Sequence, residues 1–166
     1  MKIFVVVIFM LVGLKANAQT TNYNVYALYV VNIAKYSAWP NAKGELHIVV
    51  FGKSKVFEEL LKQNGKVVNG QQLKVEQLED FALIAEPHIV YVSDGKSNSL
   101  NDVIRQTEGK SVMIVAEREG LFRKGAGFSF VIMENNTLKF DVNFSELDKR
   151  HIKVSKTLTT LANSSL

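Results

Sequence analysis

LHIVVFG, residues 46–52, is the stretch that decides the fold. It is apolar throughout apart from one histidine, and a strand that is apolar on both faces is typical of a sheet covered on both sides. HIVYVS (88–93) and SVMIVAE (111–117) repeat this pattern. SKVFEELLKQNG (54–65) and NSLNDVIRQTEG (98–109) have the apolar spacing of helices and alternate with the strands. The sequence therefore predicts an α/β fold, namely a three-layer α/β sandwich with a mixed sheet in a single domain.

The segments outside this centre predict further elements of the same sandwich. YNVYALYVVNIAKYSA (23–38) is apolar around most of its circumference, which predicts a buried helix that ends at Trp39-Pro40. SELDKRHIKVSKTLTTLANS (145–164) predicts one long terminal helix that packs on the sheet. Two hairpins are predicted, one around Asn69-Gly70 and one over residues 128–143.

The first 18 residues predict an export signal. A basic start at Lys2 is followed by an apolar run, residues 3–14, and by small residues at Ala16 and Ala18. The run would span about 18 Å as a helix, too short for a hydrocarbon core of about 30 Å. We expect cleavage after Ala18, which leaves residues 19–166 as one α/β domain. In a Gram-negative bacterium this domain would be periplasmic, with no insertion into the membrane after cleavage.

Charge and cysteine content exclude several classes of function. The 20 basic and 16 acidic residues give a formal net charge of +4, and loss of Lys2 and Lys15 with the signal leaves +2. No basic block stands out, so we expect no nucleic-acid partner. The chain has no cysteine, so an exported form has neither a disulfide nor thiol chemistry, and its fold depends on burial alone.

The tripeptide Gly-Lys-Ser occurs three times but does not predict a nucleotide site. A phosphate loop needs a glycine five residues before the glycine of this tripeptide, so that backbone N–H groups can surround the phosphates. Those positions hold His47, Val90 and Ile104. Because all three side chains are bulky, we interpret the tripeptides as ordinary ends of strands and helices.

Catalytic patterns are weak. The sequence contains no G-x-S-x-G motif, and its three histidines have no spacing typical of metal ligands, so we expect neither a metal nor a cofactor. Glu117 and Glu119 follow a strand's carboxyl end, where general acid–base chemistry or a solvated loop of mixed charge would fit, and the loop is favoured. GLFRKGAG (120–127) is either a ligand-approaching glycine loop or a flexible connector, and the connector is favoured.

An ordered set of short motifs over residues 25–162 resembles the YfiR-like family of periplasmic proteins. The matching residues are Ala27-Leu28-Tyr29, Asn32, Ala34-Lys35-Tyr36, Trp39-Pro40, Ile48, Val50, Gly52, Val68, Gly70, Leu73, Val75, Gly125, Gly127-Phe128, Phe130, Phe140-Asp141, Asn143, Ile152-Lys153-Val154-Ser155, Leu158 and Leu161-Ala162. The resemblance implies a regulator rather than an enzyme. It would bind the periplasmic domain of an inner-membrane diguanylate cyclase or sensor kinase, and so repress or modulate cyclic di-GMP signalling and biofilm formation. Family members often form homodimers, and some carry disulfides, which this chain lacks.

The candidate partner-binding residues are aromatic and basic groups with the potential to be exposed. They are Tyr36, Trp39, Arg118, Phe122, Arg123 and Lys124. Trp39 has a second interpretation as a core anchor that holds the first helix on the sheet, and this interpretation is favoured. An alternative function is a periplasmic small-ligand carrier or sensor, which requires a closed apolar pocket with a few inward polar groups.

Overall fold

The computed structural model describes residues 21–41, 43–83 and 86–166, so the predicted signal peptide and its cleavage site lie outside the described residues. The strands are β1 (Ser37–Ala38), β2 (Leu46–Phe51), β3 (Val67–Val68), β4 (Gln71–Leu78), β5 (Ile89–Val92), β6 (Met113–Ala116), β7 (Phe128–Ile132), β8 (Leu138–Val142), β9 (Lys153–Val154) and β10 (Ser164–Ser165). The α-helices are α1 (Tyr23–Lys35), α2 (Lys55–Leu61), α3 (Leu100–Gln106), α4 (Phe144–Lys149) and α5 (Lys156–Leu161). Short 3₁₀ helices are η1 (Phe81–Leu83), η2 (Asp94–Ser99) and η3 (Leu121–Lys124).

Eight strands form one mixed sheet in the order β10-β8-β7-β6-β5-β2-β4-β3. The five central strands, from β4 to β7, run parallel to one another. Antiparallel hairpins close both sides, since β3 pairs with β4 and β7 pairs with β8. A separate two-stranded ribbon pairs β1 with β9 and ties the segment after α1 to the C-terminal region. The mixed sheet of the sequence prediction is confirmed.

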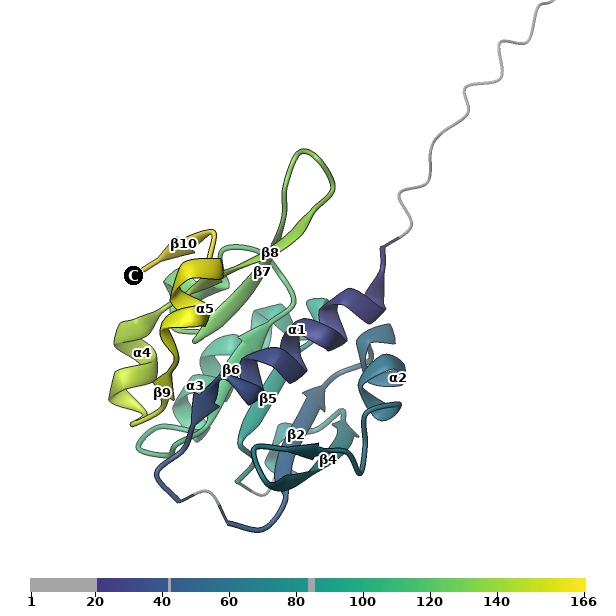
Figure 1. Ribbon diagram of the computed structural model, residues 1–166, viewed down its shortest axis with the longest axis vertical. Helices are drawn as coiled ribbons and strands as arrows, with labels where there is room; N and C mark the ends of the chain where they lie inside the picture. Colours follow the sequence, from purple (N-terminus) through teal and green to yellow (C-terminus); the bar gives the residue numbers. More distant parts are fainter. Residues whose placement is uncertain (1–20, 42, 84–85) are drawn as a thin grey trace, which may run out of the picture.

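Apolar side chains cover both faces of this sheet, which gives three layers. In β5, Ile89 and Tyr91 pack into the core beneath α1 and α2, whereas Val90 and Val92 pack into a second core with residues of α3. Figure 1 shows α1 lying across the front of the sheet, with α2 at one side and α5 at the other. The predicted three-layer α/β sandwich is therefore confirmed. It forms because the central strands are apolar on both faces and each face is covered.

Local sequence signals account for several boundaries. Ser54 caps α2, because its side-chain oxygen accepts a hydrogen bond from the backbone N–H of Val56 at 3.1 Å. Asn69 and Gly70 form the predicted hairpin turn, with φ values of 51° and 77°. Positive φ at both central residues is what a tight two-residue hairpin turn requires. The predicted hairpin at Asn69-Gly70 is confirmed.

The first helix is shorter than predicted. It ends at Lys35, and residues 37–38 form β1 instead of a last helical turn. The Asn69 side-chain amide donates a hydrogen bond to the Lys35 carbonyl at 2.9 Å, and Ser37 Oγ donates to the Ile33 carbonyl at 2.7 Å. The helix end is thus capped from a hairpin distant in sequence, which apolar periodicity does not reveal.

The predicted terminal helix over residues 145–164 is wrong. The segment forms α4, β9, α5 and β10, and the break falls at His151, whose φ is 56°. The N–H of Ile152 donates to the Leu147 carbonyl at 2.9 Å, and Ile152 itself is buried, so a left-handed residue ends α4 and turns the chain inward. His151 and Leu161, which a single helix would place on the same apolar stripe as Leu147, are exposed.

Within the described ranges, none of the helices has the length and apolar character that a membrane span needs.

Candidate functional site

The predicted partner-binding residues fall into two groups at opposite ends of the parallel strands. Trp39 lies beside His88, which precedes the amino end of β5. Arg118 and the segment up to Lys124 follow the carboxyl end of β6. The structure therefore does not bring the two groups together in one site, and each end of the sheet has to be considered separately.

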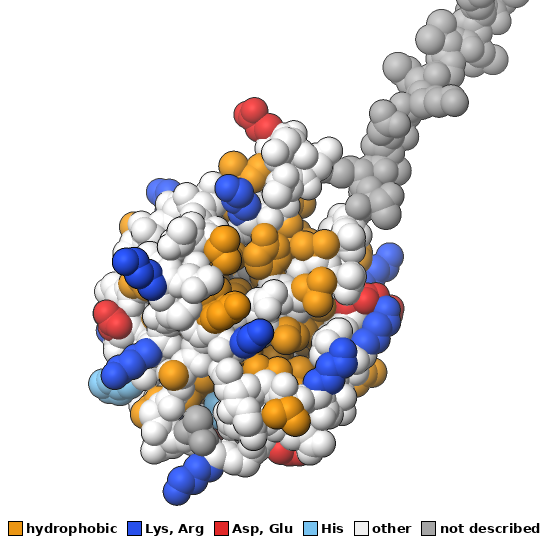
Figure 2. Space-filling model, in the orientation of Figure 1, with side chains coloured by type: hydrophobic (Ala, Val, Ile, Leu, Met, Phe, Trp, Pro, Cys, Tyr) orange, Lys and Arg blue, Asp and Glu red, His pale blue; other side chains and the backbone are white. Residues whose placement is uncertain are grey.

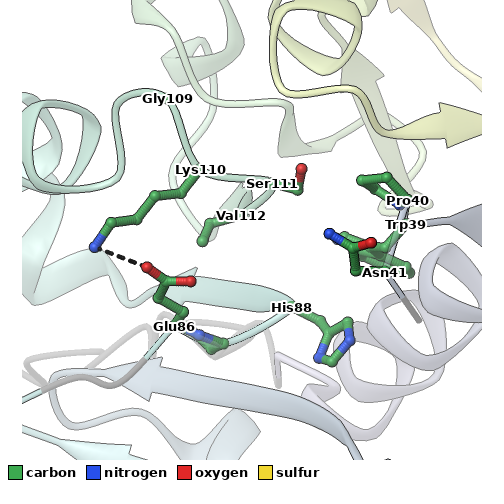
Figure 3. A pocket seen from close by; sticks show the side chains of 10 residues that line it. Trp39, Pro40, Asn41, Glu86, His88, Gly109, Lys110, Ser111 and Val112 are labelled. Carbon is green, nitrogen blue, oxygen red and sulfur yellow. Dashed lines mark ion pairs between the residues drawn. The ribbon is translucent and has the colours of Figure 1, made fainter. Parts of the chain in front are cut away.

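At the amino end lies a cavity of about 370 Å³, named here the Trp39 cavity. Three loops line it, at residues 39–41, 86–88 and 109–112. Figure 3 shows Trp39, Pro40, Asn41 and His88 on one side, and Glu86 and Lys110 on the other. The Glu86 carboxylate and the Lys110 ammonium form an ion pair at 3.5 Å. Both prolines and the single tryptophan of the chain meet at this cavity.

Trp39 is mostly inside the fold. Its side chain is 7% exposed, belongs to the core beneath α1, and meets the His88 ring edge-on at 5.5 Å between ring centroids. Its indole N–H has no hydrogen-bond partner among the described residues. Tyr36, at the end of α1, is half-buried. Trp39 therefore anchors the segment after α1, and any contact through it uses only its edge.

His88 is the polar group that sequence reasoning set aside. The backbone N–H of His47 donates a hydrogen bond to His88 Nδ1 at 3.2 Å. Because Nδ1 accepts, the ring proton is placed on Nε2. Burial lowers the pKa of His88, and the neighbouring His47 lowers it further. His88 is therefore a hydrogen-bonded residue directly before a strand.

At the carboxyl end, Arg118 forms an ion pair with Asp94, with Nε and Oδ1 2.7 Å apart. The hydrogen bond from Arg118 lowers the pKa of Asp94. Beside this pair lies a cavity of about 300 Å³ that Ser97, Arg118 and Lys124 line among others. Arg123 and Lys124 are exposed, and neither has an ion-pair partner among the described residues. These two cations are therefore available for contact with a partner at this end of the sheet.

Phe122 was a candidate for partner binding only if it were exposed, and it is buried. Its side chain is 1% exposed, and its carbonyl accepts a hydrogen bond from the buried amide of Asn143 at 2.8 Å. The glycines of GLFRKGAG serve backbone geometry and packing: Gly125 has φ 104°, and a Cβ at Gly127 would lie 2.9 Å from Leu147 Cδ2. The segment is a 3₁₀ turn held on the body of the protein.

Glu117 and Glu119, considered above as an acid–base pair, have different surroundings. Glu119 is exposed, whereas Glu117 is partly buried and accepts hydrogen bonds from Ser54 Oγ at 3.0 Å and from the Asp94 backbone N–H at 3.3 Å. Burial raises the pKa of Glu117, and these hydrogen bonds oppose the rise. The fully buried Tyr91 has no hydrogen-bond partner for its hydroxyl among the described residues. Burial raises the pKa of Tyr91, and the charge of Glu117 adds to this rise.

The glycine of the first Gly-Lys-Ser tripeptide, Gly52, is closely packed against other residues. A Cβ at Gly52 would lie 2.4 Å from both Lys96 Cγ and Ser93 Oγ. The glycine thus lets the turn after β5 close over the end of β2. In sheets of this order, ligands commonly bind in the crevice between these two strand ends. Here Ser93 and Lys96 pack closely against Gly52 at that place.

A comparison with protein families decides the relationship of the chain. The family described as YfiR/HmsC-like matches residues 23–163, which is most of its length. The chain belongs to the YfiR/HmsC-like family. The resemblance found in the sequence motifs is therefore confirmed. The YfiR-like family is known for periplasmic regulators of cyclic di-GMP signalling, and it is regulatory rather than catalytic.

A solved structure shares the fold of this YfiR-like chain. The crystal structure described as the ABC domain in complex with L-Trp from Streptococcus pneumonia matches with a TM-score of 0.58 and 12% sequence identity. The match covers 84% of this chain and 60% of the other. Identity this low shows a common arrangement of strands and helices and nothing about the ligand.

No group of three or more histidine, aspartate or glutamate side chains gathers at metal-binding distance within the part of this YfiR-like chain that the structure describes.

Proposed function

We propose that this YfiR-like protein is a periplasmic regulator that binds the periplasmic domain of an inner-membrane diguanylate cyclase or sensor kinase. By doing so it represses or modulates cyclic di-GMP signalling and biofilm formation, without catalysing a reaction. The family match over residues 23–163 is the observation that carries the proposal. The mature protein begins after Ala18, once the signal peptide has been removed.

Such a regulator works by differential affinity. It must bind the inactive state of its partner more tightly than the active state, and a ratio of about 10⁴ moves a two-state switch almost completely. A rigid docking surface suits this task, because little conformational entropy is then lost on binding. The cores on both sides of the sheet supply that rigidity.

The proposed contact surface at the carboxyl edge consists of Arg118, Arg123 and Lys124, and Tyr36 contributes at the other end. Arg123 lies with its guanidinium 5.1 Å from the Phe122 ring centroid, so the buried ring positions the exposed cation. These cations suit a partner surface with negative charge. Phe122 and Trp39 support the surface from within rather than forming it.

Deletion of the gene, followed by complementation, tests the function. We expect deletion to raise cyclic di-GMP and biofilm, and the wild-type gene to restore both. An R123E/K124E variant should restore them poorly. The control is K66E, because Lys66 is exposed and directly precedes β3, the outermost strand on one side of the sheet; this variant should restore both fully. Unchanged cyclic di-GMP and biofilm after deletion would contradict the proposal.

We also propose that the protein forms a homodimer, which light scattering of the purified protein would reveal.

A third cavity favours the alternative of a small-ligand carrier or sensor. It measures about 380 Å³ and lies between α1 and the β7–β8 hairpin, where Val25, Tyr26 and Ile132 supply apolar wall. Figure 2 shows hydrophobic side chains gathered on this face. A small apolar ligand at one hundred times its Kd would stabilise the protein by about 2.7 kcal/mol, which a thermal-shift screen detects. The screen separates this alternative from docking, which needs no small molecule.

A further inference from the structure

His88 joins three strands at the amino end of the sheet. Its backbone N–H donates to the His47 carbonyl at 2.9 Å, and its own carbonyl accepts from the Met113 N–H at 2.9 Å. The His47 N–H, which precedes the first residue pair of the β2–β5 ladder, Ile48 and Ile89, donates to the imidazole Nδ1 of His88 at 3.2 Å. A side-chain nitrogen thus completes the first step of the β2–β5 ladder.

Protonation is incompatible with this bond. An imidazolium carries a proton on both nitrogens and accepts no hydrogen bond. A proton on Nδ1 would face the His47 N–H, so two donors would oppose each other and a backbone donor would lose its partner. An unpaired buried donor costs free energy comparable to a lost hydrogen bond.

The charged groups around His88 do not offset this conflict. On β2 and β4, His47 Nε2 is 3.0 Å from Glu76 Oε2, and Lys74 Nζ is 2.8 Å from Glu76 Oε1. In the cavity-lining loops, Glu86 is paired with Lys110. Each neighbouring carboxylate is therefore bound to another group, and none is hydrogen-bonded to His88 within the described ranges.

We propose that protonation of His88 opens the Trp39 cavity, so that mild acid releases the segment that carries Trp39 from the amino end of the sheet. Trp39 rests edge-on against the His88 ring, packs into the edge of the core beneath α1, and follows the two-residue strand β1. The inference goes beyond the proposed function and does not depend on it, because the opening is a property of the isolated protein.

The direction of the pH dependence follows from the pKa of His88, which burial holds below the ordinary value of 6.5. The closed conformation favours the neutral ring. Its stability is therefore fully present above pH 6.5 and declines as the pH falls from 6.5 through the lowered pKa. A contact between imidazolium and the indole ring would act in the opposite direction, by holding Trp39 in place.

The single tryptophan makes the opening measurable. Emission wavelength and acrylamide quenching of Trp39 would be followed in the mature protein between about pH 8 and about pH 5. We expect a red shift and stronger quenching in acid, with a midpoint below 6.5. H88N keeps an acceptor oxygen near the position of Nδ1 without titrating in this range, so it should abolish the transition.

H151N is the matched control, because His151 is exposed and has a left-handed backbone that asparagine tolerates. It should titrate like the wild type. A flat wild-type curve, or an H88N curve identical to it, would overturn the proposal. So would acid quenching of the emission without greater acrylamide access, which indicates a cation contact rather than opening. If H88N does not fold, ¹⁵N NMR of the wild-type ring decides, since a protonated Nδ1 at neutral pH contradicts the geometry.

Discussion

Replacing Arg150 with methionine tests what holds the C-terminal segment against the body of the protein. Arg150 follows α4 and is 7% exposed. Its Nη1 donates hydrogen bonds to the Thr107 carbonyl at 3.1 Å, to Thr107 Oγ1 at 2.9 Å and to the Val112 carbonyl at 3.1 Å. These acceptors lie between α3 and β6, so one guanidinium links the C-terminal segment to both elements.

The expected loss follows from two opposing contributions. A hydrogen bond from a charged donor contributes about 1.5–3 kcal/mol, and the two hydrogens of Nη1 therefore supply a gross gain of about 3–6 kcal/mol. Burying a cation is itself unfavourable and lowers the pKa of Arg150, so its removal returns part of this gain. We expect R150M to lose about 2 kcal/mol of unfolding free energy, or about 4–8 °C in Tm.

Urea and thermal denaturation of the mature protein would measure this loss. R105M is the matched control, because Arg105 is exposed and forms an ion pair with Asp102 one helical turn earlier. Its unfolding free energy should change by no more than about 0.5 kcal/mol. If R150M proves as stable as the wild type, the cost of burying the cation equals the gain from its hydrogen bonds, and the reasoning fails.

Three further predictions concern packing, proton linkage and docking. G127A should lose about 1–3 kcal/mol in urea denaturation because its Cβ would lie 2.9 Å from Leu147 Cδ2, whereas G95A, with open space around its Cβ, should change by less than about 0.5 kcal/mol. Burial raises the pKa of Glu117 above 4.5, so the protonated carboxyl stabilises the fold fully below pH 4.5, and this stabilisation is lost as the pH rises through the raised pKa. When denaturation is followed against pH, E117Q should not show this loss of stability. If the partner docks beside His88, calorimetric titration with its periplasmic domain should show affinity falling below about pH 6.5 in the wild type and not in H88N.

The layered fold was predictable because it depends on short apolar segments. Strands such as β2 and β5 are buried on both faces, and a two-sided apolar run leaves few alternatives to a covered sheet. The turn at Asn69-Gly70 and the cap at Ser54 were predictable for the same reason, since each depends on the intrinsic preference of its own residues.

The C-terminal region was not predictable from periodicity. The spacing from Leu147 to Leu161 fits one helix, yet a left-handed His151 breaks it because Ile152 gains a buried place and residues 153–154 gain β1 as a partner. Both gains are tertiary. A sequence pattern weighs neighbours along the chain, and it cannot weigh contacts with a strand more than one hundred residues earlier.

The candidate site was predictable in residue type and not in arrangement. Basic residues near a glycine-rich turn are visible in the sequence, and Arg123 and Lys124 are exposed as the prediction required. Phe122 is inside because the αL glycine at position 125 closes a 3₁₀ turn that directs the ring into the core. The role of His88 was missed, since nothing in the sequence indicates that its ring would accept the N–H of His47.

The two ends of the sheet differ in a way that bears on regulation. At the carboxyl end, Ser93 and Lys96 pack closely against Gly52 where α/β proteins commonly bind ligands, and Glu117 accepts hydrogen bonds from Ser54 Oγ and the Asp94 N–H. That end is preorganised and presents cations on a rigid turn. At the amino end, by contrast, one of the backbone donors is bonded to a titratable ring. A partner that contacted both ends would meet one rigid surface with exposed cations and one surface whose conformation depends on protonation of His88. Its affinity for this protein, and not only its association rate, would then change with pH.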